Sequence, residues 1–302
     1  MQQLEEKVVA TSEEGVPATG FKVVWREFKK DKLAMTSLIA LVAIIVVTFI
    51  WAFFIDKESL MKISLLDEFA EPGTNGYILG ADQGGSDVLG QLILGTRNSM
   101  GIAIAITIIT GVLGVITGLA AGYFGGIVDA IIMRIIDFYI TLPTLMIIIV
   151  FVTIVPKFNA ITFILIMSAF LWVGTARLIR SKVLSEGKRD YVNASKTMGT
   201  KDFAIMLKGI LPNISSLLIV ELTLNFAGNV GIETGLTFLG FGLPPDVPSL
   251  GTLVGAASNP IVLQNYWWVW LPASILILIL MLAINYVGQA LRRAADSKQR
   301  IG

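Results

Sequence analysis

Residues 100–123 read MGIAIAITIITGVLGVITGLAAGY, an apolar run that contains no charged side chain. A helix needs about 20 apolar residues to cross the hydrocarbon core of a bilayer, so this stretch is long enough to span a membrane. Scanning outward with the same length gives further candidate spans at 33–55, 138–155, 160–176, 214–238 and 268–287. The sequence therefore predicts an all-α integral membrane protein with about six transmembrane helices.

The composition agrees with a lipid environment and excludes several kinds of chemistry. Hydrophobic residues make up 55% of the 302 and charged residues only 15%, whereas about a quarter of the residues in a soluble domain are charged. The chain has no cysteine and no histidine. Disulfides, thiolate metal sites, imidazole catalysis and His-ligated metals are thereby excluded.

The distribution of charge predicts the orientation. Acidic residues outnumber basic ones in the loop 56–98, whereas the segment 177–212 and both chain ends are rich in lysine and arginine. The positive-inside rule then places both termini and the segment 177–212 in the cytoplasm. Six spans with both termini on one side are mutually consistent.

The predicted organisation follows from these spans. A cytoplasmic N-terminal tail at 1–32 ends in a basic, aromatic stretch, interpreted as an interfacial anchor or, alternatively, a docking segment. The first span, 33–55, is too long for a signal-peptide core. The remaining predicted parts are an extracytoplasmic loop at 56–98, a core of five spans at 99–290 with the cytoplasmic loop 177–212 inside it, and a basic cytoplasmic tail at 291–302.

The loop 177–212 is long for a connection between membrane helices and is predicted to be folded. Asp190 to Met198 is compatible with a helix, and Gly199 can supply the positive φ that ends it. Thr200 can cap a second helix from Lys201 to Ile210, and Pro212 marks the start of the next span. Two short helices meeting closely at a glycine corner are therefore expected below the membrane.

Polar residues recur every four positions in the fifth span, at Glu221, Asn225, Asn229 and Glu233. At 100° per residue they form one slowly winding stripe on the helix. Ionisable residues inside a span usually face protein or a water-filled cavity. The stripe can be a functional surface that lines a passage or contacts a partner subunit. Alternatively, it can form a structural hydrogen-bond ladder between helices.

Other patterns in the spans indicate structure. Gly111, Gly114, Gly118 and Gly122 place small residues mainly at fours and predict close helix packing. Arg134 and Asp137 are three apart and can pair on one helix face. Arg177 and Arg180 follow the fourth predicted span and are expected to snorkel to the interface. A tryptophan cluster is expected in an interfacial belt, at Trp267, Trp268 and Trp270.

A resemblance to a known family rests first on the loop. Asn193-Ala194-Ser195, Gly199 and Leu211-Pro212 resemble the permease loop of bacterial ABC importers, whose usual form is Glu-Ala-Ala, three residues, Gly, nine residues, Ile, any residue, Leu-Pro. This chain has Asn193 for Glu, Ser195 for the second Ala and Gly209 for Ile, but it keeps the spacing.

Further stretches resemble the peptide/nickel permease family in particular. They cover about residues 22–295 and are similar to the C-type subunit of dipeptide or oligopeptide importers. The stretches are Arg26 to Leu33, Leu79 to Asp82, Gly95 to Ser99, Gly122 to Gly126, Leu236 to Gly242 and Pro248 to Gly251.

The resemblance implies a type I ABC importer permease in a prokaryotic plasma membrane, with peptides as substrate and no enzymatic activity of its own. It implies a second homologous permease subunit, two ATP-binding subunits that hold ATP and Mg, and an extracytoplasmic solute-binding protein; no nucleic-acid partner is expected. The residues it implies for ATPase coupling are Asn193, Ala194, Ser195, Gly199, Lys201, Asp202, Leu211 and Pro212.

Alternatives remain at this point. The chain has no Gly-x-x-x-x-Gly-Lys-Ser/Thr motif, so it cannot hold ATP in a P-loop of its own. Nickel is the other substrate of the family, although nickel favours imidazole ligands and this chain has none. An ion-coupled secondary transporter would favour inverted repeats, which the sequence does not show convincingly. A membrane-embedded hydrolase is disfavoured, because the sequence has no histidine or cysteine and shows no paired catalytic carboxylates or Ser-Lys arrangement.

Overall fold

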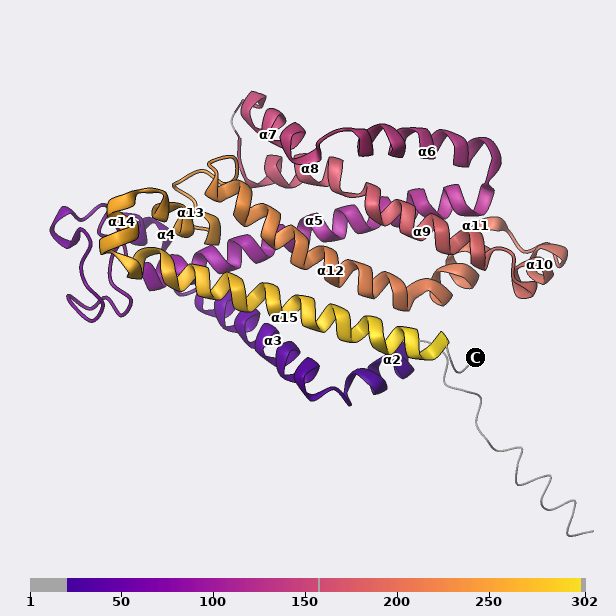
Figure 1. Ribbon diagram of the computed structural model, residues 1–302, viewed down its shortest axis with the longest axis horizontal. Helices are drawn as coiled ribbons and strands as arrows, with labels where there is room; N and C mark the ends of the chain where they lie inside the picture. The colour runs from indigo at the N-terminus through magenta and orange to yellow at the C-terminus, as the bar shows by residue number, and fades with distance from the viewer. Residues whose placement is uncertain (1–20, 157, 300–302) are drawn as a thin grey trace, which may run out of the picture.

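The computed structural model describes residues 21–156 and 158–299, and within these ranges the chain is helical, with one isolated β-bridge between Ala81 and Asp87. The predicted tail 1–32 lies outside the described residues over 1–20, as does the end of the basic tail over 300–302. Four long helices run side by side along the molecule (Figure 1). They are α3 (Lys32–Trp51), α5 (Val88–Phe124), α12 (Leu211–Phe238) and α15 (Trp267–Gln299).

Two further spans are bent. Helices α6 (Gly126–Thr141) and α7 (Thr144–Ile154) meet at 83°, and α8 (Ala160–Leu171) and α9 (Val173–Glu186) meet at 41°. Counting each pair as one crossing gives up to six spans in the described part of the chain, in agreement with the predicted number. The first bend falls at Pro143, whose ring disfavours helical geometry at the preceding residue; Leu142 accordingly has an extended backbone.

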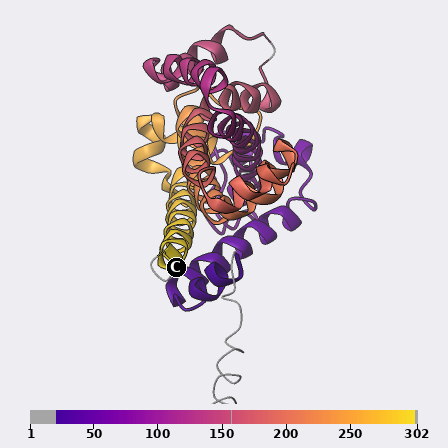
Figure 2. The ribbon, with the colours of Figure 1, turned by 90° about the vertical axis from the view of Figure 1, so that its right-hand side faces the viewer.

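The two ends of the molecule are built differently (Figure 1), and Figure 2 views the molecule from the end that carries α10. At one end, called the α14 end, the loop 52–87 gathers with three short segments, α13 (Leu250–Gly255), η3 (Ala256–Ser258) and α14 (Pro260–Asn265); this loop contains α4 (Lys57–Leu60) and η1 (Leu65–Asp67). The opposite end, called the α10 end, holds α2 (Phe21–Phe28), α10 (Asp190–Thr197), α11 (Asp202–Ala204), the π-helical segment η2 (Ile205–Ile210) and the end of α15.

Several predicted boundaries move. The second span begins twelve residues earlier than its apolar run, at Val88, because the carboxylate of Asp87 accepts hydrogen bonds from Leu89 N and Gly90 N and caps the helix. The range 177–212 begins inside α9, so residues 177–186 are helical and continue the fourth span rather than forming a loop.

The tryptophan cluster is divided between two environments. Trp268 is buried beneath the loop at the α14 end, and its Nε1 donates to the carbonyl of Ala81 at 3.2 Å. Trp267 is exposed. Trp268 therefore differs from the exposed ring expected of an interfacial belt, because its indole is covered by the loop and hydrogen-bonded to it.

Candidate functional site

The segment 190–212, called the elbow, is folded as two arms around Gly199. Helix α10 ends in a Schellman motif, in which Gly199 N donates to Lys196 O and Thr200 N donates to Ser195 O, both at 3.0 Å. Gly199 has φ of +75°, as the sequence predicted. A Cβ built there meets no atom within 4 Å. The glycine is required by the backbone conformation, and not by the close helix approach that the sequence suggested.

The second arm differs from the prediction in its cap and its geometry. Lys201, not Thr200, occupies the N-cap position of α11, and no side chain caps this helix. The helix then widens into the π-helical segment η2, in which Leu211 N donates to Met206 O, five residues back. Pro212 has no N–H with which to continue an α-helical ladder to Lys208. From Asp202 to Phe238 the second arm of the elbow and the span nevertheless form one continuous helix.

Tyr123, at the end of α5, ties the elbow to the membrane helices. Its hydroxyl donates to Asp202 Oδ1 at 2.6 Å, and the ammonium of Lys196 lies 4.7 Å from its ring centroid. One tyrosine therefore holds both arms of the elbow. The predicted site includes Asp202 but omits Tyr123. The sequence signals were an aromatic residue at the end of an apolar span and its place in the family-like stretch Gly122 to Gly126.

The inner side of the elbow is an apolar core. Val192 from α10 and Met206 and Ile210 from η2 are buried together with Ile179 and Val183 of α9. The remaining predicted coupling residues take different positions. Asn193, Ala194, Lys201 and Pro212 are exposed, Leu211 is half-buried, and the half-buried Ser195 donates its hydroxyl to the carbonyl of Tyr191.

The outer side of the elbow exposes large apolar side chains. Met198 is 77% exposed and Phe203 is 68% exposed, one on each arm, with Gly199 between them in the sequence. These two side chains make the outer side of the elbow partly apolar. The sequence prediction named neither residue, because apolar residues in a short helix are more often buried.

The polar stripe on α12 divides in two. Asn229 and Glu233 are buried within this chain: Asn229 Nδ2 donates to Thr107 Oγ1 of α5 at 2.9 Å, and Glu233 accepts from Thr234 and Thr237. Glu221 and Asn225 are half-buried. Asn225 Nδ2 reaches Thr175 Oγ1 of α9 at 3.0 Å and lies 3.4 Å from Glu221 Oε1. In this conformation the stripe carries hydrogen bonds between helices.

The glycine stripe of α5 packs against α9, as predicted. A Cβ on Gly114 lies 2.6 Å from Thr175 Cβ, one on Gly118 lies 2.7 Å from Ala176 O, and one on Gly122 lies 2.7 Å from Val183 Cβ. Gly111 faces α12 instead, where a Cβ lies 2.5 Å from Leu222 Cδ2. These close approaches fix α9, and with it the first arm of the elbow, to α5.

Arg180 is fixed by an ion pair that the sequence did not predict. Its guanidinium holds Asp129 of α6 in a two-point contact, through Nε to Oδ1 and through Nη2 to Oδ2, the latter at 2.6 Å. Arg134 and Asp137, the predicted pair, form no ion pair with each other among the described residues. The expectation that Arg180 snorkels is therefore wrong: the side chain joins α9 to α6.

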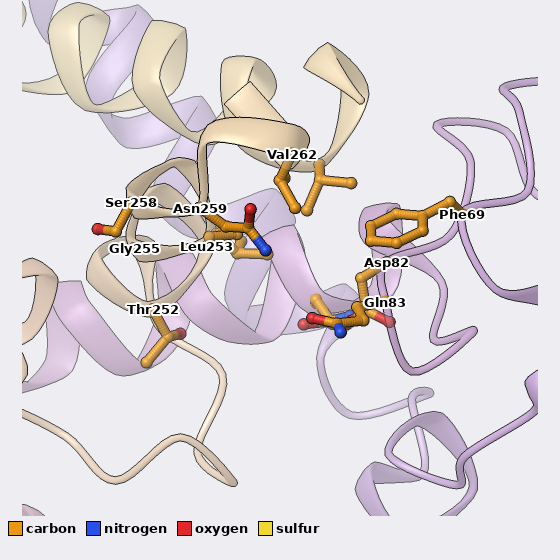
Figure 3. A pocket seen from close by; sticks show the side chains of 12 residues that line it. Phe69, Asp82, Gln83, Thr252, Leu253, Gly255, Ser258, Asn259 and Val262 are labelled. Carbon is orange, nitrogen blue, oxygen red and sulfur yellow. The ribbon is translucent and has the colours of Figure 1, made fainter. Parts of the chain in front are cut away.

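The α14 end contains a cavity of about 440 Å³ between the loop 52–87 and the segment α13–α14 (Figure 3). Phe69 and Val262 form an apolar wall, and Asp82, Gln83 and Asn259 contribute polar groups. Asp82 is occupied structurally, because Oδ1 accepts from Gly84 N and Ser86 N while Oδ2 accepts from Gln91 Nε2 at 2.6 Å. No group of three or more metal-ligating side chains occurs among the described residues.

Comparison with known proteins gives two family matches. The model of the binding-protein-dependent transport system inner membrane component matches residues 114–301, and that of the N-terminal TM domain of oligopeptide transport permease C matches residues 19–65. The oligopeptide transport system permease protein OppC of Lactococcus lactis subsp. lactis (strain IL1403) is 52% identical over 273 residues, which cover 90% of this chain and 93% of that protein. The dipeptide transport system permease protein DppC of Bacillus subtilis (strain 168) is 35% identical over 277 residues, covering 91% and 85%.

Proposed function

Because the chain belongs to the family of binding-protein-dependent transport system inner membrane components, we propose that it is the C-type permease subunit of an ATP-driven importer of oligopeptides or dipeptides. It is a multi-pass protein of the bacterial plasma membrane and a transport subunit rather than an enzyme. The relatives named above are permeases of oligopeptide and dipeptide transport systems, and peptides are therefore the proposed substrate class.

The elbow is the observation that supports coupling to an ATPase. Coupling between subunits requires a packed element that moves as a unit. The elbow has an apolar inner core, a tyrosine that holds both arms, and an exposed apolar outer surface at Met198 and Phe203. We propose that this surface docks on a separate ATP-binding subunit, which also holds the Mg. The coupling residues proposed from the sequence are retained, and Tyr123 is added as their anchor.

The orientation is proposed from charge. The elbow, α2 and the described end of α15 lie at the α10 end and are rich in lysine and arginine, whereas the acid-rich loop 56–87 is at the opposite end. Under the positive-inside rule the α10 end is cytoplasmic. The α14 end then faces the extracytoplasmic solute-binding protein, and a second homologous permease subunit completes the passage.

We further propose that α12 borders the passage, with Glu221, Asn225, Asn229 and Glu233 as its polar face. Asn229 and Glu233 are covered by this chain in the present conformation, so they reach the passage only when α12 moves relative to α5. Single cysteines in this cysteine-free chain test the proposal. Protection of Asn225→Cys and Asn229→Cys from water-soluble thiol reagents in every nucleotide state would leave only the hydrogen-bond ladder.

Uptake measurements test the function itself. Cells with and without the gene are given labelled di- and oligopeptides, and separately labelled nickel, after either ATP depletion or dissipation of the ion gradient. The proposal expects peptide uptake that needs the gene and ATP. Uptake that persists without ATP and stops when the ion gradient is removed would instead identify a secondary transporter, and gene-dependent uptake of nickel alone would identify a nickel permease.

A further inference from the structure

Arg177 is an unpaired cation on a membrane-embedded helix. It lies on α9 beside Thr175, Ala176 and Ile179, the residues that pack against Gly114 and Gly118 of α5. That contact fixes its level inside the 37-residue span α5, in the half toward the α10 end. Its side chain is exposed, and it forms no ion pair or hydrogen bond in the described part of the chain.

Arg180, three residues further along α9, has the acidic partner that Arg177 lacks among the described residues. Arg180 is held by Asp129 through two parallel contacts, so its charge is satisfied inside the protein. A charged side chain within a span is costly unless it meets water, an opposite charge or the headgroup layer. Arg177 has no such anion among the described residues, so its charge requires water, the headgroup layer or an anion from outside this chain.

Arg177 borders a cavity of about 410 Å³ formed where the two bent spans meet. The α6–α7 bend contributes Tyr139 and Leu145, the α8–α9 bend contributes Phe170 and Gly174, and α12 contributes Ile232. The rings of Tyr139 and Phe170 lie 5.6 Å apart and form part of the wall. The volume is within the range of small-molecule sites, and apolar walls with one charged group are typical of such sites.

Gly174 lines the cavity together with Arg177. It precedes Arg177 by three residues, so the two occupy the same face of the helix. A Cβ at Gly174 meets nothing within 4 Å. The fork of an arginine matches the two oxygens of a carboxylate.

We propose that this cavity is a station for the C-terminal end of the transported peptide, where Arg177 binds the terminal carboxylate and the aromatic wall accepts the last side chain. The inference rests on the proposed peptide transport. It also uses the position of Ile232 on α12, the helix proposed to border the passage. Every unmodified linear peptide carries this carboxylate, so one arginine can serve peptides of any sequence.

The first test compares two labelled tetrapeptides that differ only in a C-terminal carboxylate or amide. Uptake is measured in cells that lack the gene and carry the wild-type chain, Arg177→Gln, Arg177→Lys or the control Arg134→Gln. Arg134 is exposed, has no ion pair in the described chain and does not line the cavity. The readout is the acid-to-amide uptake ratio relative to wild type, because the other subunits are common to all strains.

Arg177→Gln is expected to lower that ratio about tenfold, the loss of one charge-assisted interaction, and Arg177→Lys less. Arg134→Gln is expected to leave it unchanged. An equal loss for both peptides, together with reduced recovery of the assembled transporter, would overturn the proposal and identify Arg177 as a contact to a partner subunit. No loss for either peptide would identify a contact with lipid headgroups or water.

A second test does not depend on whether the system accepts amidated peptides. Gly174→Cys, which lines the cavity and keeps Arg177, and the control Arg134→Cys are made in this cysteine-free chain. Peptides whose C-terminal or N-terminal cysteine carries a thiopyridyl group are added during ATP-driven uptake. The proposal expects the thiolate at position 174 to displace the thiopyridyl group of the C-terminal cysteine as thiopyridone and so form a disulfide with the peptide. Little reaction is expected with the N-terminal cysteine, and none at position 134. Equal labelling by both peptides, or none, would refute it. If wild-type cells take up no peptide, the proposed function fails first.

Discussion

Gly199 offers a direct test of whether the shape of the elbow carries the coupling. Its φ of +75° closes the Schellman motif of α10, and no atom lies within 4 Å of a Cβ placed there. A substitution therefore strains the backbone without creating a clash within this chain. Left-handed geometry costs a non-glycine residue about 1–2 kcal/mol, less for asparagine and more for a β-branched side chain.

That strain sets the expected magnitude. About 1–2 kcal/mol corresponds to a change of about 5–30-fold in the equilibrium between the closed turn and its open forms. Gly199→Ala is expected to raise the population of open turns about fivefold and to lower the number of peptides imported per ATP hydrolysed by up to that factor. Gly199→Val is expected to lower it further, and Gly199→Asn to remain within about twofold of wild type.

The assay is ATP hydrolysis and peptide uptake by the complete transporter in proteoliposomes. Gly240 provides a matched control, since it has φ of +84°, has open space around it and closes a similar motif at the end of α12, with Gly240 N bonded to Thr237 O and Phe241 N to Leu236 O. Gly240→Ala is expected to reduce stability to a similar extent and to leave the ratio of peptide to ATP intact.

Import of as many peptides per ATP by Gly199→Val as by wild type would show that the elbow does not need this turn. An equal loss in Gly240→Ala would show that the effect is not specific to the elbow. Gly199→Trp adds separate information. Because this chain leaves the position open, any loss beyond that of Gly199→Val reports contact of the bulky ring with another subunit.

Three further outcomes are expected. Asp129→Asn leaves Arg180 without its partner and should lower the free energy of unfolding by about 2 kcal/mol, between the values for surface and buried pairs. Thermal unfolding in detergent measures this change. Adding Arg180→Gln to the same chain should restore part of the lost stability. Gly118→Ala should destabilise α5 by about 1–3 kcal/mol through overpacking, whereas Gly101→Ala, in open space on the same helix, should not. Hydrogen bonds from neighbouring side chains hold the pKa of Asp67 below its ordinary value. The contribution of Asp67 to stability is therefore present above about pH 4 and lost as the pH falls through the lowered folded pKa. Amide exchange in the surrounding loop should rise over that acid range in the wild-type chain, but not in Asp67→Asn.

Each of these has a result that contradicts it. If the double variant Asp129→Asn, Arg180→Gln is no more stable than Asp129→Asn alone, the unpaired guanidinium carries no penalty. Equal stability of the two glycine variants would show that the α5–α9 contact is looser than described. Acid sensitivity that survives in Asp67→Asn would assign it to another carboxylate.

The spans could be predicted because lipid imposes one rule on the whole chain. Each crossing needs a long apolar helix, and the runs at 33–55 and 100–123 satisfy it without help from tertiary contacts. Gly199 was predictable for a similar reason, since a positive φ at the end of a short helix selects glycine. The resemblance of the motifs then identified the family.

The parts that depend on distant partners were not predictable. Tyr123 meets Asp202 across 79 residues, and Arg180 meets Asp129 across 51, so helical spacing suggested a local pair at Arg134 and Asp137 instead. The bend at Pro143 had a signal in the proline, which the apolar run obscured. The bend at Trp172 has neither a proline nor a glycine at its apex.

The continuous helix from Asp202 to Phe238, with its π-helical segment near one end, has a mechanical consequence. At 1.5 Å per residue, the 28 residues of α12 form an arm about 42 Å long. If the π-helical segment at its base serves as a pivot, a tilt of about 5° displaces the far tip by about 4 Å, which is close to the diameter of a methyl group. Under the proposed coupling, a small movement of the elbow is therefore expected to displace the far end of α12 by about the size of a peptide side chain.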